Sequence, residues 1–285
     1  MIVLTYMLLL ISVLSVWCFK NKPYSKLFLI PLVGTLLAAY FSNSINYIGV
    51  LVIVTLFFLA YLYSYLEKNH KYSRIFYHIL CIIIFIFTFL IFNHMLSGFN
   101  NLLVLEKIQV SQNAIPFTMY FNLDKVLAGL TLLFLVVPLT LNISHAIKRS
   151  WYLSLLTIIL IMVTALYFKL VKFDFKLHDY FLIFAINNLF FVSMAEEVLF
   201  RGFLQRHLSL LKIKFASLIG ILLPAIIFGL FHLKAGVPFM IFATLSGIMY
   251  GLVYHRSKSI EVTIFTHFLL NFIHITFFTY PFLIN

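Results

Sequence analysis

Long apolar stretches alternate with short polar ones along nearly the whole chain. A membrane-spanning helix needs about 20 predominantly apolar residues, within a range of about 17–25. Ten stretches approach this length, and the second and fifth of them are short: residues 1–19, 27–42, 47–66, 75–94, 126–142, 151–170, 181–205, 215–233, 237–254 and 260–279. The pattern predicts an all-α fold, a polytopic transmembrane helix bundle of about ten spans.

Composition and charge support this prediction. Of the 285 residues, 64% are hydrophobic and only 10% are charged, whereas soluble domains average about 25% charged residues. The net charge of +12 is spread through short loops, which fits positive-inside anchoring and does not indicate nucleic-acid binding. Loops after odd-numbered spans, including the one with Lys71, carry more cations than the others, so we expect them to be cytoplasmic and both termini to lie outside.

The N-terminal stretch and the cysteines indicate no processing and no redox site. The chain runs from Met1 directly into apolar sequence and reaches Lys20 without a small-residue cleavage site, so we expect a retained span rather than a signal peptide. Cys18 and Cys81 form no CxxC pair, so the sequence does not support a thiolate zinc site or a disulfide framework.

One long connection, from Met95 to Lys125, falls on the predicted outer side. Its stretch from Ile108 to Phe121 holds an Asn-Ala-Ile-Pro turn signal between two β-prone runs, which predicts a small hairpin or an interfacial flap. Unusual polar residues gather after Asn187. We therefore divide the chain into an N-terminal packing half, 1–180, with the extracytoplasmic loop 95–125, and a catalytic half, 181–285.

Two adjacent glutamates stand inside the seventh apolar run. Glu196 and Glu197 are the only acids in the interior of any such run, because the other six lie in loops or at segment ends. A carboxylate at membrane depth is by default a functional-site hypothesis because it costs several kcal/mol. Glu197 and Arg201 are i and i+4 with the acid first, the favoured order for a helix ion pair. Glu196 points about 100° away around the helix and can act as a proton acceptor. Alternatively, both acids pair with cations on neighbouring helices.

Two histidines and an asparagine follow in later spans. The eighth span holds Phe228 and His232, and the tenth holds His267 and Asn271 on one face, which His274 extends. Polar groups in a bilayer need partners, so these side chains should face the bundle interior. Each also has an ordinary interpretation, His232 as an interfacial histidine and the other two as helix-packing contacts worth about 1 kcal/mol.

The predicted depths of these residues in the membrane differ. Counting about 1.5 Å per residue from the cytoplasmic ends places His267 and Asn271 near mid-membrane and His232 near the outer end of its span. A kink at Pro224 or Gly229, or an interfacial course for residues 201–214, would reduce this difference.

Together these groups suit the hydrolysis of a peptide bond. Glu196 with His232 could hold and deprotonate a water molecule, and His267 with Asn271 could donate hydrogen bonds to the oxyanion. A second arrangement uses Glu196, His232 and His267 as ligands of a zinc ion that activates the water. The residue types satisfy both arrangements, so no cofactor is certain and zinc stays an alternative.

At this point the chain resembles a known family. The motifs EExxxR (Glu196, Glu197, Arg201), FxxxH (Phe228, His232) and HxxxN (His267, Asn271) are similar, in order and spacing, to the signature of the CPBP family of CAAX prenyl endopeptidases and bacteriocin-processing enzymes, also called Abi proteins. The resemblance covers roughly residues 180–275 and implies an all-helical intramembrane endopeptidase with an eight-helix core.

The resemblance also implies a role for each motif residue. Glu196 and His232 activate water, His267 and Asn271 form the oxyanion hole, and Glu197 and Arg201 support them together with Phe228. The family has been described both as metal-dependent and as using a glutamate-type mechanism, and we favour the latter. The expected partners are a membrane peptide or protein substrate and the lipid bilayer, and the expected location is a bacterial inner membrane.

Other classes fit less well. The chain has no HExxH motif, no aspartate within a span, and no rhomboid-type glycine ahead of Ser246. The main rival is a proton-coupled transporter that uses Glu196, but the inverted repeats of many transporters are not visible. A third possibility is a non-catalytic scaffold, against which the intact motifs argue.

Overall fold

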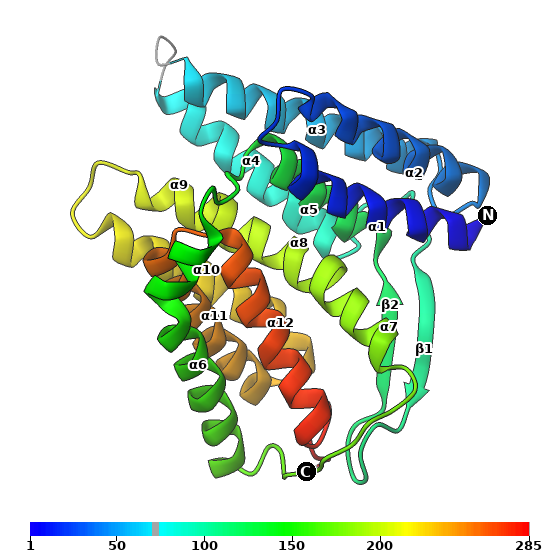
Figure 1. Ribbon diagram of the computed structural model, residues 1–285, viewed down its shortest axis with the longest axis vertical. Helices are drawn as coiled ribbons and strands as arrows, with labels where there is room; N and C mark the ends of the chain where they lie inside the picture. The colour runs from blue at the N-terminus through cyan, green and yellow to red at the C-terminus, as the bar shows by residue number, and fades with distance from the viewer. Residues whose placement is uncertain (70–73, 285) are drawn as a thin grey trace. The chain divides into compact units, whose positions relative to one another are not determined.

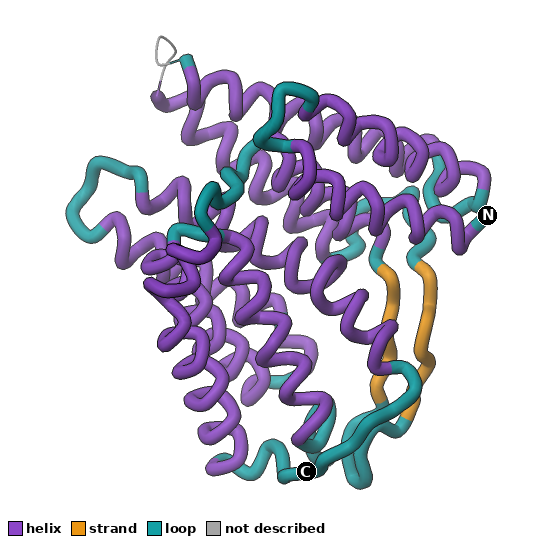
Figure 2. Tube along the Cα trace, viewed as in Figure 1, coloured by secondary structure: helices purple, strands orange, loops and turns teal. Residues whose placement is uncertain are grey.

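The computed structural model describes residues 1–69 and 74–284 (Figure 1). Lys71, one of the cations of the predicted cytoplasmic loops, lies outside the described residues. Helices dominate the described chain, and its one sheet has two strands (Figure 2). The all-α, polytopic fold class is therefore confirmed.

Seven helices among the described residues are long and apolar enough to cross a membrane. They are α1 (Ile2–Phe19), α3 (Tyr47–Lys68), Ile75–Phe92 within α4 (Arg74–Phe92), α6 (Ile143–Tyr167), the continuous helix Phe181–Ser209, α11 (Val237–Ser257) and α12 (Ile260–Phe277). The other predicted spans are shorter helices: η1 with α2 (Ser25–Phe41), α5 (Leu123–Leu135) and α10 (Ala216–Phe231). The chain is an integral multi-pass membrane protein.

Two predicted boundaries were wrong. The fifth span, predicted at 126–142, is the helix α5, which ends at Leu135, because Pro138 cannot continue a helix and biases the residue before it away from helical geometry. The sixth, predicted to begin at 151, begins at Ile143. The side chain of Asn142 accepts a hydrogen bond from the backbone N–H of His145 at 3.0 Å and so caps the helix start, and the polar first turns hid this start from a hydropathy count.

The chain folds as two compact units, and the first contains residues 1–102, 121–139 and 190–203. Within it α1 packs on α2 and α5, α3 packs on α4 and α5, and α5 packs on α8 (Met194–Glu197). A Cβ atom on Gly129 would lie 2.8 Å from the Cα of Ala195. The glycine therefore allows the backbone of α5 to touch the helix turn that bears the glutamates.

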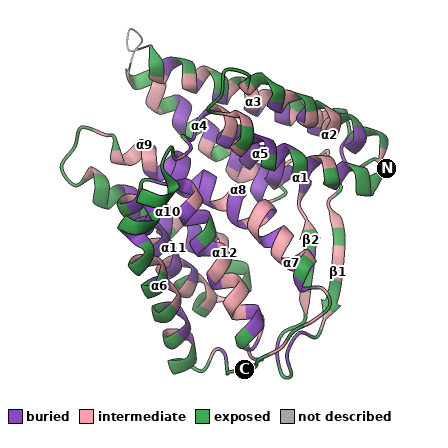
Figure 3. Cartoon of the chain, in the orientation of Figure 1, coloured by how far each residue is buried: buried purple, intermediate pink, exposed green. Residues whose placement is uncertain are grey.

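The second unit contains residues 103–120, 140–189 and 204–285. Its helices α6, α11 and α12 pack on one another, and α10 packs on α11. A Cβ atom on Gly229 would lie 1.8 Å from Oγ1 of Thr244, and one on Gly247 would lie 3.0 Å from the Cα of Ala225. These glycines bring α10 and α11 into close backbone contact, as small residues do between membrane helices. Figure 3 shows the exposed outer surface of α6, which suits contact with lipid.

The predicted hairpin is present in the 95–125 loop. Its strands are β1 (Leu102–Ile108) and β2 (Phe117–Phe121). The first strand lies earlier than the sequence indicated, because residues 109–116 form a wide turn. The side-chain N–H₂ of Gln109 donates to the backbone carbonyls of Ser111 and Ala114 inside this turn, and Asn113 adopts the left-handed conformation that asparagine tolerates.

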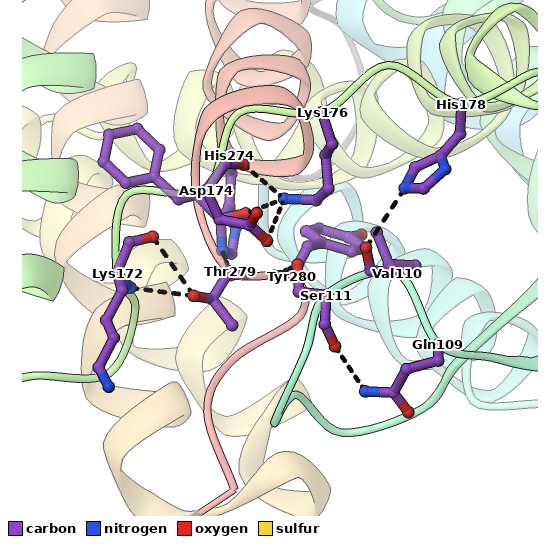
Figure 4. Close-up of polar contacts among 11 residues, drawn as sticks. Gln109, Val110, Ser111, Lys172, Asp174, Lys176, His178, His274, Thr279 and Tyr280 are labelled. Atoms are coloured by element: carbon purple, nitrogen blue, oxygen red, sulfur yellow. Dashed lines mark hydrogen bonds and ion pairs between the residues drawn. The ribbon is translucent and has the colours of Figure 1, made fainter.

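Three segments of the second unit interlock at one end of α12, and we call them the cap: residues 109–115, 170–176 and 278–284. Their backbones form isolated bridges between Ala114 and Leu283 and between Phe173 and Phe278. The ammonium of Lys176 donates to Oδ2 of Asp174 at 3.1 Å and to the carbonyl of Phe278 at 2.5 Å (Figure 4). The cap therefore ties the hairpin turn, the segment before α7 (Phe181–Ile186) and the segment after α12 to one another.

Candidate active site

The continuous helix from Phe181 to Ser209 is the most enclosed of the candidate spans, with 56% of its apolar window buried. It departs from α-helical geometry in two places. The π-helical stretches η2 (Asn187–Ser193) and η3 (Val198–Gln205) flank the α-helical turn α8, Met194–Glu197. Short π-helical insertions occur frequently at functional sites. The paired glutamates thus occupy the one regular turn between two irregular ones.

Glu197 and Arg201 form the ion pair that their spacing predicts. Nη1 of Arg201 lies 2.9 Å from Oε1 of Glu197, and the side chains are 1% and 0% exposed. The guanidinium also lies 5.7 Å from the ring centroid of Phe200, within reach of a cation–π interaction. Removing either partner would leave a buried unpaired charge, so this pair fixes the helix on which Glu196 stands.

Glu196 lies on the same turn but is less enclosed than its neighbour. Its side chain has intermediate exposure, while Ala195 and Glu197 are buried. Among the described residues of its own unit, no group forms a hydrogen bond or ion pair with it. Glu196 therefore keeps a carboxylate that is open to a water molecule or a substrate.

His232 lies directly after α10, in the second unit. Its Nδ1 atom is 2.8 Å from the carbonyl oxygen of Phe228, and since a carbonyl can only accept, Nδ1 must carry the hydrogen. In the neutral ring Nε2 is then an acceptor. The 16 residues of α10 span about 24 Å, short of the hydrocarbon thickness of about 30 Å. A helix of this length is too short to cross the hydrocarbon region if it lies along the bilayer normal.

The ring of Phe228 contacts both motif histidines. Its centroid lies 4.7 Å from that of His232 and 6.0 Å from that of His267, perpendicular to the latter at 89°. His267, 4% exposed, also stacks on Tyr250 of α11 with centroids 4.6 Å apart and planes at 20°. Phe228 therefore brings the two imidazoles into one aromatic cluster, in which Tyr250 holds the plane of His267. No sequence pattern indicated that Tyr250 belongs to this cluster.

Asn271 lies one turn beyond His267 on α12 and contacts a residue that sequence reasoning missed. Its Nδ2 atom lies 3.3 Å from Oδ1 of Asn188. Asn188 is 7% exposed and belongs to η2. A buried amide inside an apolar run was the signal that could have identified it, because such a group needs a partner in a bilayer.

His274, which extends the face of His267 and Asn271, contacts the cap. Its Nε2 atom lies 3.1 Å from the carbonyl of Thr279, and its ring lies 5.0 Å from that of Tyr280. Within either unit, no three His, Cys, Asp or Glu side chains of the described residues gather to hold a metal ion. Glu196 belongs to the first unit and His232 and His267 to the second, so the zinc alternative stays a prediction.

The two units contain different chemical groups. The first holds the partly exposed carboxylate of Glu196, on a helix fixed by a buried ion pair. The second holds an imidazole whose Nδ1 donates to a carbonyl, a second imidazole held by two aromatic rings, and an amide. Groups of these types can take a proton from water and donate hydrogen bonds to a developing oxyanion.

Comparison with known proteins gives one match. Residues 178–273 match the family model described as type II CAAX prenyl endopeptidase Rce1-like. No curated protein and no solved structure matches the chain.

Proposed function

We propose that this chain, whose residues 178–273 match the type II CAAX prenyl endopeptidase Rce1-like family model, is an intramembrane endopeptidase of membrane-associated peptides or proteins. The observation that carries the proposal is the extent of that match. It contains all three motifs in order, from Glu196 to Asn271. The fold suits such a substrate, since a multi-pass helix bundle meets it within or at the bilayer.

The proposed reaction begins with a water molecule held by Glu196 and His232. The carboxylate takes a proton from the water while its oxygen attacks the carbonyl carbon of the scissile bond. Nε2 of His232, which is an acceptor because Nδ1 is committed to the carbonyl of Phe228, orients the water. The carbonyl oxygen becomes an oxyanion.

His267 and Asn271 stabilise this oxyanion by donating hydrogen bonds, each worth about 3–4 kcal/mol in comparable sites. When the intermediate collapses, the carbon–nitrogen bond breaks and the proton held by Glu196 passes to the leaving amine. Glu197 and Arg201 act through the helix, and Phe228 acts through the two imidazoles. No step requires a metal ion, so we propose the glutamate-type mechanism.

The test compares cleavage of a membrane-peptide library by the purified protein and by Glu196→Gln. We expect the substitution to lower cleavage by at least 100-fold, in line with the loss of a positioned acid–base group. Glu106→Gln is the matched control, since Glu106 is an exposed glutamate of β1, and should cleave as the wild type does. Equal cleavage by the wild type and Glu196→Gln would remove the enzyme assignment.

Two rivals predict different outcomes. A zinc-dependent site would lose activity with a chelator and regain it with zinc, through Glu196, His232 and His267. A proton-coupled transporter would show uptake into vesicles that depends on Glu196, without cleavage of any peptide. As substrate we propose a leader peptide, pheromone precursor or membrane protein of a bacterial cytoplasmic membrane.

A further inference from the structure

Two asparagines from distant parts of the chain meet inside the second unit. The side-chain nitrogen of Asn271, on α12, lies 3.3 Å from the side-chain oxygen of Asn188, 83 residues earlier. Asn188 is 7% exposed, and its neighbour Asn187 is 4% exposed. Placing an amide inside an apolar bundle is costly unless it finds a partner, so this contact needs an explanation beyond packing.

The helices that carry the pair are held together by a second contact. The rings of Phe181 and Phe272 lie 6.1 Å apart, and Phe272 directly follows Asn271. Phe272 also contacts Phe268 at 5.5 Å, on the same helix. The start of the helix that carries the glutamates therefore packs against α12 next to Asn271.

The contact decides which way the amide of Asn271 faces. An amide carries a carbonyl oxygen, which only accepts, and an N–H₂ group with two hydrogens to donate. Because Oδ1 of Asn188 accepts, Asn271 must turn its N–H₂ group toward it, which uses one hydrogen and leaves the other. An unrestrained amide could present its carbonyl oxygen to a developing negative charge instead, and this would oppose the reaction.

We propose that Asn188 is a positioning residue of the active site, which orients the amide of Asn271 so that its second N–H hydrogen points at the oxyanion. The inference rests on the proposed function, because the oxyanion exists only if the chain hydrolyses a carbonyl. In this proposal Asn188 acts on the reaction through Asn271. One continuous helix then supplies both the acid, Glu196, and the residue that orients the amide.

The effect should fall on turnover and not on binding. A donor that meets charge only in the transition state changes kcat and leaves KM unaltered. Removing such a donor costs about 100- to 1,000-fold in kcat. In Asn188→Leu the amide of Asn271 is still present but is no longer oriented, so the loss of kcat should be smaller. We expect kcat of Asn188→Leu to fall by about 10- to 100-fold.

The test is a double-mutant cycle measured on the full chain in proteoliposomes, with kcat and KM for Asn188→Leu, Asn271→Ala and the double variant. If Asn188 acts through Asn271, the double variant should be no slower than Asn271→Ala. Asn188→Ala, which adds no bulk, provides the same cycle should the leucine variant not fold. Asn187→Leu is the matched control, since Asn187 is the adjacent buried asparagine, and it should retain the kcat of the wild type.

The outcomes separate this inference from the proposed function. Glu196-dependent cleavage with an unchanged kcat in Asn188→Leu and Asn188→Ala would overturn the role of Asn188 alone. If the two losses of kcat multiply in the double variant, the role of Asn188 is also overturned, because such losses indicate independent structural damage. Cleavage that does not depend on Glu196 would overturn the proposed function and this inference with it.

Discussion

The carboxylate of Glu197 and the guanidinium of Arg201 meet at 2.9 Å in a place that solvent does not reach, whereas Glu196, one residue earlier, has no such partner among the residues of its unit that the structure describes. Adjacent acids on one helix turn therefore have different surroundings. The buried pair is structural, because each charge needs the other. The neighbouring carboxylate is available for chemistry. This difference makes the first prediction possible.

Breaking the ion pair should destabilise the protein much more than removing the proposed catalytic acid. Arg201→Met removes the guanidinium that pairs with the buried carboxylate of Glu197, and breaking a buried pair in this way typically costs about 3–5 kcal/mol. The double variant Glu197→Gln/Arg201→Met should recover most of this loss. Glu196→Gln should unfold as the wild type does while losing cleavage. Thermal unfolding in detergent measures the stabilities, and equal destabilisation by Glu196→Gln and Arg201→Met would contradict the division of roles.

The proposed reaction requires that residues 196 and 232 come close together. Glu196→Cys and His232→Cys are introduced together into a background that carries Cys18→Ser and Cys81→Ala. A short bifunctional thiol reagent should link the two introduced cysteines, because the native side chains must reach one water molecule. The control pairs Glu106→Cys with His232→Cys in the same background. Mass spectrometry of the digested protein detects the linked peptides. A yield no higher than the control's would argue against a shared site.

Chelation distinguishes the two mechanisms. A glutamate-type enzyme should keep its full rate after dialysis against a strong chelator, since Glu196 and not a metal ion accepts the proton of the water. The rate is measured before dialysis, after it, and after zinc is added back. A loss on chelation that zinc reverses would replace the proposed mechanism with one in which His232 and His267 are ligands.

The close contact between α10 and α11 should not tolerate a methyl group at Gly229. A Cβ atom there would lie 1.8 Å from Oγ1 of Thr244 and 2.8 Å from the carbonyl of Met240. Gly229→Ala should therefore cost about 1–3 kcal/mol, as overpacking does, and should displace the helix end that carries His232. Thr244→Ala should restore part of the stability. Gly34→Ala, where the nearest atom would be 3.6 Å away, should cost little, and thermal unfolding tests all three.

Acid should loosen the cap. Burial is the largest single influence on the pKa of Asp174 and raises it, but the hydrogen bonds from Ser111 and Lys176 and the charge of Lys176 together lower the pKa below its ordinary value. A carboxyl whose pKa is lower in the folded state stabilises it above its unfolded pKa of about 3.9, and this contribution is lost as the pH falls toward the folded value. Because Asp174 is partly exposed, the contribution should be at most about 1 kcal/mol.

Hydrogen exchange of residues 278–284 provides the measurement for the cap. At neutral pH the tail of Asp174→Asn should exchange faster than that of the wild type, because Lys176 loses its charged partner at 3.1 Å. Once the pH falls below the lowered pKa of Asp174 in the folded state, the two proteins should converge, since the carboxyl is then protonated in both states. A difference that persists at low pH would assign the effect to packing and not to the charge.

Much of the fold follows from local sequence. The apolar runs of about 20 residues located the long spans, and the turn signal at Asn113 located the hairpin. The start of α6 was misplaced because its first turns, from Ile143 to Arg149, are polar. A hydropathy count records only the length of apolar sequence. The capped, polar start of this helix adds no apolar length, so the count does not detect it.

Sequence alone determined what depends on residues a few positions apart: the long apolar helices and the ion pair of Glu197 with Arg201. These follow from helix geometry, which is the same wherever the helix lies. Tertiary structure decided the stacking of Tyr250 on His267, the place of Phe228 against both imidazoles, and the bond from Asn271 to Asn188. Those contacts join helices that are far apart in the chain, so packing and not periodicity selects the partners.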